Sequence, residues 1–414
     1  MQELTQQRTT SAGLARPWHS GIPWNFFGLW LALRLLTFAW AAYISSQRPV
    51  TLREQRISFW SSSSSLTAWL ERFLLAPWER YDVVWYIRIV QNGYRADDGT
   101  AQFHPLFAWL SSPLAWLTGQ PLVGLLTVSS LASLLVLFAF WHLARLDLNA
   151  NLATISTTLF VSFPVAFVLF IPYTEGLWLL CAIICLYCAR RGLWWRAGLA
   201  GMFATLTRQQ GVFLLLPVAW ELWAASAWNW RRAMSAWRSW CALLLIPLGL
   251  LVWLIYRALL LNDLNSDFSN LHSTIYSIII SPSANQVVPI QSFMTPVQAL
   301  WLAIGVLYQT PSLPLIIDLV LGSVFVLMLI LAWPRLRTSY RIYSVVIFVV
   351  SFGYNTGPFY PYMGLPRHLL LAFPVFIGAA PLLNRSISRM LVLSMSLLGF
   401  FFCIMTFVLY SWVP

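Results

Sequence analysis

Long apolar runs, separated by short polar segments, constrain this sequence more than any other feature. Eleven of the runs are long enough to cross a bilayer as helices if short or tilted spans are allowed. Only 9% of the residues are charged, whereas a soluble domain carries roughly 25%. The pattern predicts an all-α polytopic membrane protein that forms one integral-membrane domain over residues 1–414. The predicted spans are Trp24–Ser46, Leu122–Ala144, Leu152–Phe170, Gly176–Ala189, Trp194–Thr207, Val212–Ala227, Trp240–Leu261, Leu313–Trp333, Ile342–Asn355, Leu369–Leu383 and Met390–Trp412.

Two further apolar stretches, Phe103–Thr118 and Val297–Tyr308, are shorter and flanked by proline. Their composition allows re-entrant, interfacial and spanning positions. If Phe103–Thr118 crossed the membrane, every later segment would change sides. The arginine-rich segments would then no longer all lie on one side of the membrane. We therefore favour a re-entrant position for this stretch and expect about 11 transmembrane helices.

All 25 basic residues are arginine, and the formal net charge is +12. When the eleven runs alternate in direction, the arginine clusters between them fall on one side, which the positive-inside rule identifies as the cytoplasm. Residues 1–23 then form a cytoplasmic tail, and residues 47–102 and 262–296 form the two large non-cytoplasmic loops. Because the clusters form no continuous basic face, nucleic acid is not an expected partner. The expected location is the plasma membrane of a prokaryote or the endoplasmic reticulum of a eukaryote.

The first non-cytoplasmic loop has the pattern of two interfacial helices. Apolar residues lie on one helical face at Leu66, Trp69, Leu70, Phe73 and Leu74. Such an amphipathic helix lies along the membrane surface. Pro77 breaks it, and a second helix is predicted to begin near Trp78. The two helices would hold Asp82 at the boundary between lipid and water.

Acidic residues are scarce, 13 in all, so each one is informative. Asp82 and Glu175 are flanked by aromatic residues on the predicted non-cytoplasmic side. Asp318 and Glu221 lie in or near apolar runs, where structural ion pairs are the simplest role. Asp147, like most of the others, is in a polar segment where solvation is expected. The candidates for chemistry are therefore Asp82 and Glu175.

Two interpretations of Asp82 stay open on residue chemistry alone. In the first, Asp82 caps a helix or pairs with Arg80. In the second, it is a general base that takes a proton from a hydroxyl group, while arginine residues on the same side bind an anionic leaving group. Trp85 and Tyr86 would then present their ring faces to a sugar or a lipid.

Four segments resemble the PIG-V-like mannosyltransferases, a branch of the GT-C membrane glycosyltransferases, and occur in the same order. "RYDVVWYIRIVQNGY…FHPLFAWL" is similar to the family's "WD..WY..IA..GY…FFPL.P" pattern. "FPVAFVLFIPYTEGLWLL" resembles its "NPAS.FFS..YTESLF" stretch. "GLWWRAGLAGMFATLTRQQG" resembles "GRWWLA…LATLTRP.G", and "GLPRHLLLAFPVF" resembles the "PRYLL..FP.F" region. Together the segments run from about Arg80 to Phe376 and cover most of the chain.

The resemblance implies a GT-C-type helix bundle and an inverting glycosyltransferase. Such an enzyme moves mannose from a polyprenyl-phosphate-mannose donor to a lipid-linked or glycan acceptor on the non-cytoplasmic face. Asp82 would be the catalytic base. Arg208 and Arg367 would bind the donor phosphate, and Glu175 would position a hydroxyl group or an arginine. In-line displacement would place the base and these arginines on opposite sides of the anomeric carbon.

Contacts to the acceptor or the sugar are expected from Glu79, Trp85, Tyr86, His104, Glu175 and His368. For the two histidines, a merely interfacial, hydrogen-bonded role is the favoured alternative. No cofactor and no metal are expected, because a lipid-phosphate leaving group carries less charge than a nucleotide diphosphate. The chain departs from the family pattern at His104 and His368, where aromatic residues are usual, and at Phe163 and Gly176. These departures concern the acceptor more than the class of reaction.

Two other classes of function fit parts of the sequence. A lipid or sugar flippase, or another transporter, would explain the spans and the arginines, but it would need polar residues in mid-membrane, where Asp318 is the main one. A non-catalytic subunit with the same fold would be expected to have lost the loop carboxylate, yet Asp82 is present. The sequence therefore favours the transferase.

The predicted orientation is testable by labelling engineered cysteines in a cysteine-free variant. A membrane-impermeant reagent added from outside should label sites in residues 47–102 and 262–296, and it should leave sites beside Arg232 and Arg337 unlabelled. Labelling beside Arg232 from outside would reverse the orientation and the proposed side of the active site.

Overall fold

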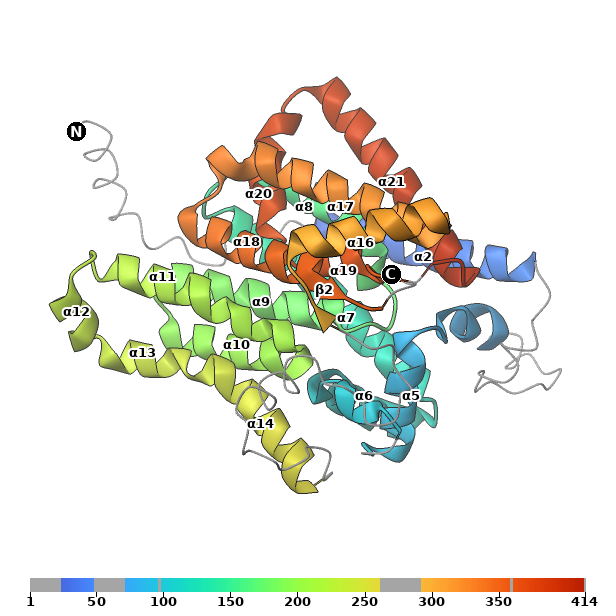
Figure 1. Ribbon diagram of the computed structural model, residues 1–414, viewed down its shortest axis with the longest axis horizontal. Helices are drawn as coiled ribbons and strands as arrows, with labels where there is room; N and C mark the ends of the chain where they lie inside the picture. The colour runs from blue at the N-terminus through green and yellow to red at the C-terminus, as the bar shows by residue number, and fades with distance from the viewer. Residues whose placement is uncertain (1–23, 48–70, 96–97, 261–291, 358–359, 413–414) are drawn as a thin grey trace.

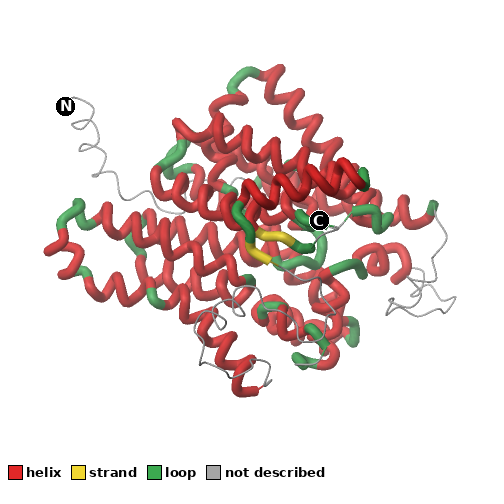
Figure 2. The backbone as a smooth tube through the Cα atoms, viewed as in Figure 1, coloured by secondary structure: helices red, strands yellow, loops and turns green. Residues whose placement is uncertain are grey.

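The structure is a computed structural model that describes residues 24–47, 71–95, 98–260, 292–357 and 360–412. Helices make up almost all of this part of the chain (Figure 1, Figure 2). Within it, the only sheet is the antiparallel pair of β1(Ser292–Phe293) and β2(Tyr354–Asn355). The prediction of an all-α polytopic membrane protein is confirmed.

Five helical stretches in the described residues are long and apolar enough to cross a membrane. They are α2(Asn25–Ser46), α7(Pro121–Ala144), the consecutive α13(Trp237–Leu243) and α14(Leu245–Leu260), α17(Leu313–Ala332) and α21(Ser386–Val408). Each coincides with a run identified in the sequence. Lipid-facing side chains on these helices are exposed, as the apolar solvent of a bilayer allows.

The remaining helices are shorter than a bilayer core is thick. At a rise of about 1.5 Å per residue, 16 residues extend only about 24 Å, whereas the hydrocarbon core measures about 30 Å. They are α5(Asp82–Asn92), α6(Pro105–Thr118), α8(Ala150–Ser162), α9(Glu175–Arg190), α10(Trp194–Thr207), α11(Leu215–Ala225), α12(Trp230–Ser235), α16(Pro296–Gln309), α18(Thr338–Gly353), α19(Leu365–Leu370) and α20(Pro374–Ala379). Seven short helical turns join them: η1(Glu71–Leu75), η2(Ala76–Trp78), η3(Thr100–Gln102), η4(Pro164–Leu169), η5(Gln209–Leu214), η6(Trp333–Arg335) and η7(Ala380–Leu383).

Two predicted spans are broken helices. The run Leu152–Phe170 was expected to form one helix, but α8 ends at Ser162 and the chain continues as η4. The run Leu369–Leu383 is divided among α19, α20 and η7. Pro164 and Pro374 explain the breaks, because proline lacks an N–H group and clashes with the preceding turn.

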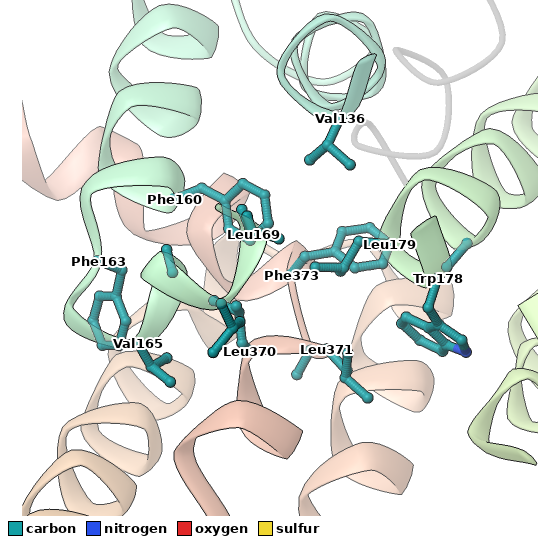
Figure 3. Packing of buried hydrophobic residues seen from close by; sticks show 14 of the residues in the cluster. Val136, Phe160, Phe163, Val165, Leu169, Trp178, Leu179, Leu370, Leu371 and Phe373 are labelled. Carbon is teal, nitrogen blue, oxygen red and sulfur yellow. The ribbon is translucent and has the colours of Figure 1, made fainter. Parts of the chain in front are cut away.

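The broken segments form the centre of the molecule instead of a lipid-facing surface. Nearly every residue of η4, α19 and α20 is buried. Figure 3 shows Val165 and Leu169 of η4, Leu370 of α19 and the following Leu371 and Phe373 in one hydrophobic cluster with side chains of α7 and α9. Irregular backbone at membrane depth is tolerated only where protein covers it. These segments therefore form a protein-covered core that can carry polar groups.

Arg34, in the first long helix, supports this core. Its guanidinium donates hydrogen bonds to the carbonyl oxygen of Phe170, at the end of η4, and to the hydroxyl of Ser130. A third, longer bond reaches the carbonyl of Leu126 at 3.4 Å, and the ring of Phe38 lies 4.8 Å away. Arg34 thus satisfies a carbonyl that the broken helix leaves without an intrahelical donor.

The stretch before Asp82 differs from the sequence prediction. Leu66, Trp69 and Leu70 of the first amphipathic helix lie outside the described residues, while η1 and η2 occupy the positions that follow. The second helix, α5, begins at Asp82 and not near Trp78. The start is displaced because Tyr81 has φ 52° and ψ −122°, which is not helical backbone.

The re-entrant position of Phe103–Thr118 stays a prediction, and α6 forms there with Pro113 inside it.

An ionic network joins four segments far from Asp82 in the sequence. Asp147 was expected to be solvated, but Arg190 donates to both of its carboxylate oxygens at 2.8 and 2.9 Å. Glu221 accepts from Nε and Nη2 of Arg337 at 2.7 and 3.0 Å, as an ion-pair role predicts. Arg190 also donates to the hydroxyl of Tyr340 at 2.8 Å. The network fixes the ends of α9, α11 and α18 to one another.

Close packing in the core gives a test of the fold. A Cβ atom added at Gly378 of α20 would lie 2.8 Å from Ala332 Cβ and 2.9 Å from the Ala332 carbonyl oxygen. We expect Gly378→Ala to lower stability by about 1–3 kcal/mol through overpacking. Gly28→Ala is the control, because nothing lies within 4 Å of that position. Thermal unfolding in nanodiscs that gives equal midpoints for the two variants would contradict the packing.

Candidate active site

Four charged residues from distant parts of the chain meet in one cluster, the ionic cluster Asp82, Glu175, Arg208 and Arg367. Asp82 and Glu175 are the first residues of α5 and α9. Arg208 directly follows α10, and Arg367 lies in α19. All four are candidate residues predicted from the sequence, and the structure brings them into contact.

Glu175 is the centre of this cluster. Its side chain is wholly buried, and Oε1 accepts a hydrogen bond from Nη1 of Arg208. The same oxygen lies 3.2 Å from Nε of Arg367. That contact is an ion pair and does not meet hydrogen-bond geometry. Within the described residues the Nε–H group of Arg367 therefore makes an ion pair but no hydrogen bond. A carboxylate buried this deeply requires such cations, because an isolated charge would be strongly disfavoured there.

Asp82 stands at the accessible edge of the cluster. Arg367 Nη1 donates to Asp82 Oδ2 at 2.6 Å. The Asp82 side chain is 34% exposed, and within the described residues its Oδ1 has no hydrogen-bond partner. Arg367, and not Arg80, is therefore the ion-pair partner of Asp82. One carboxylate oxygen is held in place while the other can accept a proton.

Both carboxylates lie at the N-terminus of a helix. The N-terminus of a helix carries partial positive charge, and both acids occupy the first helical position of their helices. The first turns contain no other acidic residue. The helix N-termini and the arginines therefore both place positive charge beside Asp82 and Glu175.

Each arginine of the cluster has donor capacity left over. Arg208 uses Nη1 for Glu175 and for the hydroxyl of Thr174 at 3.2 Å, and its Nε points to Gln210 at 3.5 Å. Arg367 uses Nη1 and Nε as described. In the described part of the chain neither Nη2 has a protein partner. Two guanidinium groups with an unused nitrogen are suited to binding the oxygens of an anion.

Tyrosine side chains line the cluster, and the sequence analysis found only one of them. The Arg367 guanidinium lies 5.2 Å from the ring centre of Tyr173. Burial raises the pKa of Tyr86, and the charges of Asp82 and Glu175 raise it further while Arg208 opposes them. Tyr354 also lies near enough to Arg367, Arg208 and Asp82 to interact electrostatically with all three. The three tyrosines therefore surround the charged residues of the cluster.

Tyr173 and Tyr354 were missed for different reasons. Tyr173 stands two positions before Glu175 in "YTEG", so the resemblance segment already contained it, and only its chemistry was overlooked. Tyr354 lies in β2, and no motif marks it. Its place beside the cluster depends on the β1–β2 pairing, which aligns Phe293 with Tyr354.

The two histidines are buried and neutral. His104 Nδ1 donates to the carbonyl oxygen of Thr205 at 2.7 Å, because a carbonyl can only accept. Burial lowers the pKa of His104 to about 3, and the charges of Arg257 and Arg208 act in the same direction. Burial also lowers the pKa of His368 well below its usual range, together with Arg208 and Arg367. Near neutral pH neither ring carries the second proton of an imidazolium, so neither is a cationic general acid.

Trp85 and Glu79 make their described contacts away from the four charges. The Trp85 ring stacks on Phe103 at 5.8 Å, and Arg88 lies 5.2 Å above it. Glu79 is buried, and its carbonyl oxygen accepts from the Tyr410 hydroxyl at 3.3 Å. Their roles as sugar or acceptor contacts stay predictions. Within the described residues no group of three or more His, Cys, Asp or Glu side chains gathers.

Fold and site together define an all-helical membrane protein with a charged cluster held in its protein core. No family model matches the chain, and no curated protein matches it at a significant level. Among solved structures, ArnT from Cupriavidus metallidurans bound to undecaprenyl phosphate is 15% identical, with 88% of this chain and 61% of that chain covered and a TM-score of 0.49. The Archaeoglobus fulgidus oligosaccharyltransferase is 11% identical, with 92% and 56% covered and a TM-score of 0.44. This chain spans about three fifths of the length of these proteins.

The neutral histidines predict how stability depends on pH. The unfolded chain binds a proton at each histidine near pH 6.5, whereas folded His104 resists protonation until about pH 3. More protons are bound in the unfolded state between these values, so stability falls as the pH drops below about 6.5. His104→Gln should reduce the fall in the unfolding midpoint between about pH 7.5 and pH 5. An unchanged slope in the variant would mean that His104 does not contribute.

Proposed function

We propose that the protein is an inverting glycosyltransferase that moves mannose from a polyprenyl-phosphate donor to a hydroxyl group of a lipid-linked or glycan acceptor. The observation that carries the proposal is Asp82, a partly exposed carboxylate with one free oxygen beside two arginines that have unused donors. The sequence resemblance supplies the donor class and the sugar. The reaction takes place on the non-cytoplasmic face, where the predicted topology puts Asp82.

In this mechanism Asp82 Oδ1 accepts the proton of the acceptor hydroxyl as that oxygen attacks the anomeric carbon. The bond between the anomeric carbon and the phosphate oxygen breaks on the opposite side of the sugar, and the polyprenyl phosphate departs with the bonding electrons. Configuration at the carbon is inverted because a single displacement occurs. Arg367 holds the other Asp82 oxygen, so the base is oriented before the acceptor arrives.

The arginines divide the remaining work. The 2.6 Å contact between Arg367 and Asp82 leaves no room for a sugar ring between them. Arg367 therefore lies on the same side of the sugar as Asp82, and not on the opposite side with the leaving phosphate. Arg208 is the better donor to the phosphate, through Nη2, and Arg367 chiefly positions Asp82. Charge-assisted hydrogen bonds of this kind stabilise the negative charge that develops on the leaving group.

A transporter would use the polar residues within the spans differently. Coupling to an ion requires carboxylates that exchange partners or protons during transport. Asp318, the candidate in the sequence, accepts a hydrogen bond from Trp412 Nε1 at 3.0 Å in a fully covered position. Arg34 binds backbone carbonyls. Both side chains are engaged in fixed contacts, which favours the transferase.

The base is tested by Asp82→Asn, which keeps the shape and removes the basic oxygen. Transfer of radiolabelled mannose from polyprenyl-phosphate-mannose to a membrane lipid extract should be lost, while donor binding stays near the parent value. The matched control is Asp147→Asn, which also breaks an arginine pair at similar side-chain exposure, 27% against 34%. The control should retain transfer. Activity of Asp82→Asn within a few-fold of the parent would exclude Asp82 as the base, and Glu175 would be tested next.

The phosphate contact is tested by Arg208→Lys, which keeps one cation near Glu175 and removes Nη2. Donor KM should rise or kcat should fall by a factor equivalent to about 1.5–3 kcal/mol, the range of a charged hydrogen bond. Arg385→Ala, at an exposed position before α21, should change neither constant. Equal losses in both variants would indicate an effect on folding or insertion and would contradict a phosphate contact.

A further inference from the structure

Tyr410, just beyond the end of α21, contacts each of the three residues that precede Asp82. Its hydroxyl donates to the Glu79 carbonyl at 3.3 Å. The Arg80 guanidinium lies 4.4 Å from the centre of its ring. The ring of Tyr81 meets it edge-on, with centroids 5.5 Å apart. One side chain, more than 300 positions away in the sequence, therefore supports the whole approach to the proposed base.

Arg80 reinforces this contact through the backbone. Its Nε donates to the carbonyl of Val408 at 3.0 Å, and its Nη1 donates to the carbonyl of Ala76 at 2.7 Å. Val408 is the last residue of α21, whose final carbonyls have no intrahelical donor. Arg80 thus ties the end of α21 to the η2 turn and lies next but one to Asp82.

Tyr81 has a backbone conformation that the neighbouring contacts must maintain. Its φ of 52° lies in the left-handed region, which is unfavourable for a residue with a Cβ atom. Tyr410 has φ 55° and is in the same region. The Tyr81 ring also packs 5.5 Å from Phe407. Because α5 starts directly after Tyr81, this conformation determines where Asp82 enters the helix and in which direction its carboxylate points.

The segment 407–412 is itself anchored on two sides. Trp412 is fully buried, and its Nε1 donates to Asp318 in α17 at 3.0 Å. The ring centres of Phe407 and Tyr173 lie 6.1 Å apart. The Tyr173 ring also lies beside the Arg367 guanidinium. The end of α21 therefore contacts the residues behind Asp82 and the tyrosine beneath its arginine partner. It holds the two members of the Asp82–Arg367 pair at a fixed separation.

We propose that Tyr410 is a positioning residue for Asp82, and that Trp412 anchors it through Asp318. The inference rests on the proposed role of Asp82 as the base, and it assigns to the end of α21 the task of aiming that base. A loss of Tyr410 removes no member of the ionic cluster, but it lets residues 79–81 relax, which moves the Asp82 carboxylate. Misplacement of a base by about 1 Å is sufficient for a large loss in rate.

The test compares Tyr410→Ala, Tyr410→Phe and Phe402→Ala in the full chain in nanodiscs. Phe402 is the control: an aromatic residue within α21, two turns before Tyr410, 41% exposed and without a described ring contact. Tyr410→Ala should lower kcat about tenfold or more with donor KM little changed. Tyr410→Phe, which keeps the ring against Arg80 and Tyr81, should recover most of the rate. The control should behave as the parent.

Hydrogen exchange at the start of α5 supplies a readout independent of activity. Amides of residues 82–86 should exchange faster in Tyr410→Ala and not in Phe402→Ala, while binding of polyprenyl phosphate is retained. Parent-like kcat and exchange in Tyr410→Ala would overturn the inference. If Tyr410→Ala does not fold, Trp412→Phe replaces it, because this change removes the Nε1 donor to Asp318 and keeps a smaller aromatic ring at the buried position. Lower kcat and faster exchange at residues 82–86 support the inference, and parent-like values overturn it. Full activity in Asp82→Asn would refute the base itself, while the exchange result would still report whether Tyr410 holds α5.

Discussion

The burial of the Glu175 carboxylate is the constraint on which the site depends. A buried carboxylate is tolerated only when cations and hydrogen bonds compensate for lost water. Arg208 and Arg367 do so from two other segments, and Arg367 then extends the cluster to Asp82. Glu175 therefore acts as the fixed point that gathers α9, α10 and α19, and through Arg367 it sets the place of the exposed acid.

A second constraint shapes the backbone around that fixed point. The segments that carry Glu175 and Arg367 follow or contain broken helices, whose free polar groups need partners inside the protein. Arg34 supplies such a partner at Phe170, five positions before Glu175. Irregular backbone lets a charged side chain enter the core from a helix end, where N–H dipoles also favour an anion. Pro164 and Pro374 thus interrupt two apolar runs, and the irregular backbone beside them allows charged side chains into the core.

Hydropathy and the scarcity of acids predicted much of this arrangement. The long spans followed from hydropathy, and Asp82 and Glu175 from the scarcity of acids in so apolar a chain. The family resemblance, and not scarcity, selected Arg208 and Arg367 among 25 arginines. The breaks at Pro164 and Pro374 were missed because an apolar run has the same composition in a spanning helix and in a buried core. Tyr354 and Tyr410 were missed because their roles arise only from tertiary contacts. The sides of the membrane and the substrates stay predictions.

Arg34 has a consequence for how the chain is assembled in the membrane. A cation in the middle of α2 is unfavourable in lipid until its donors find acceptors. Those acceptors belong to α7 and to the end of η4, more than 90 positions later in the sequence. The first long helix therefore reaches its lowest energy only after the core that carries Glu175 has formed beside it. The final packing of α2 therefore depends on the same segment that leads into Glu175.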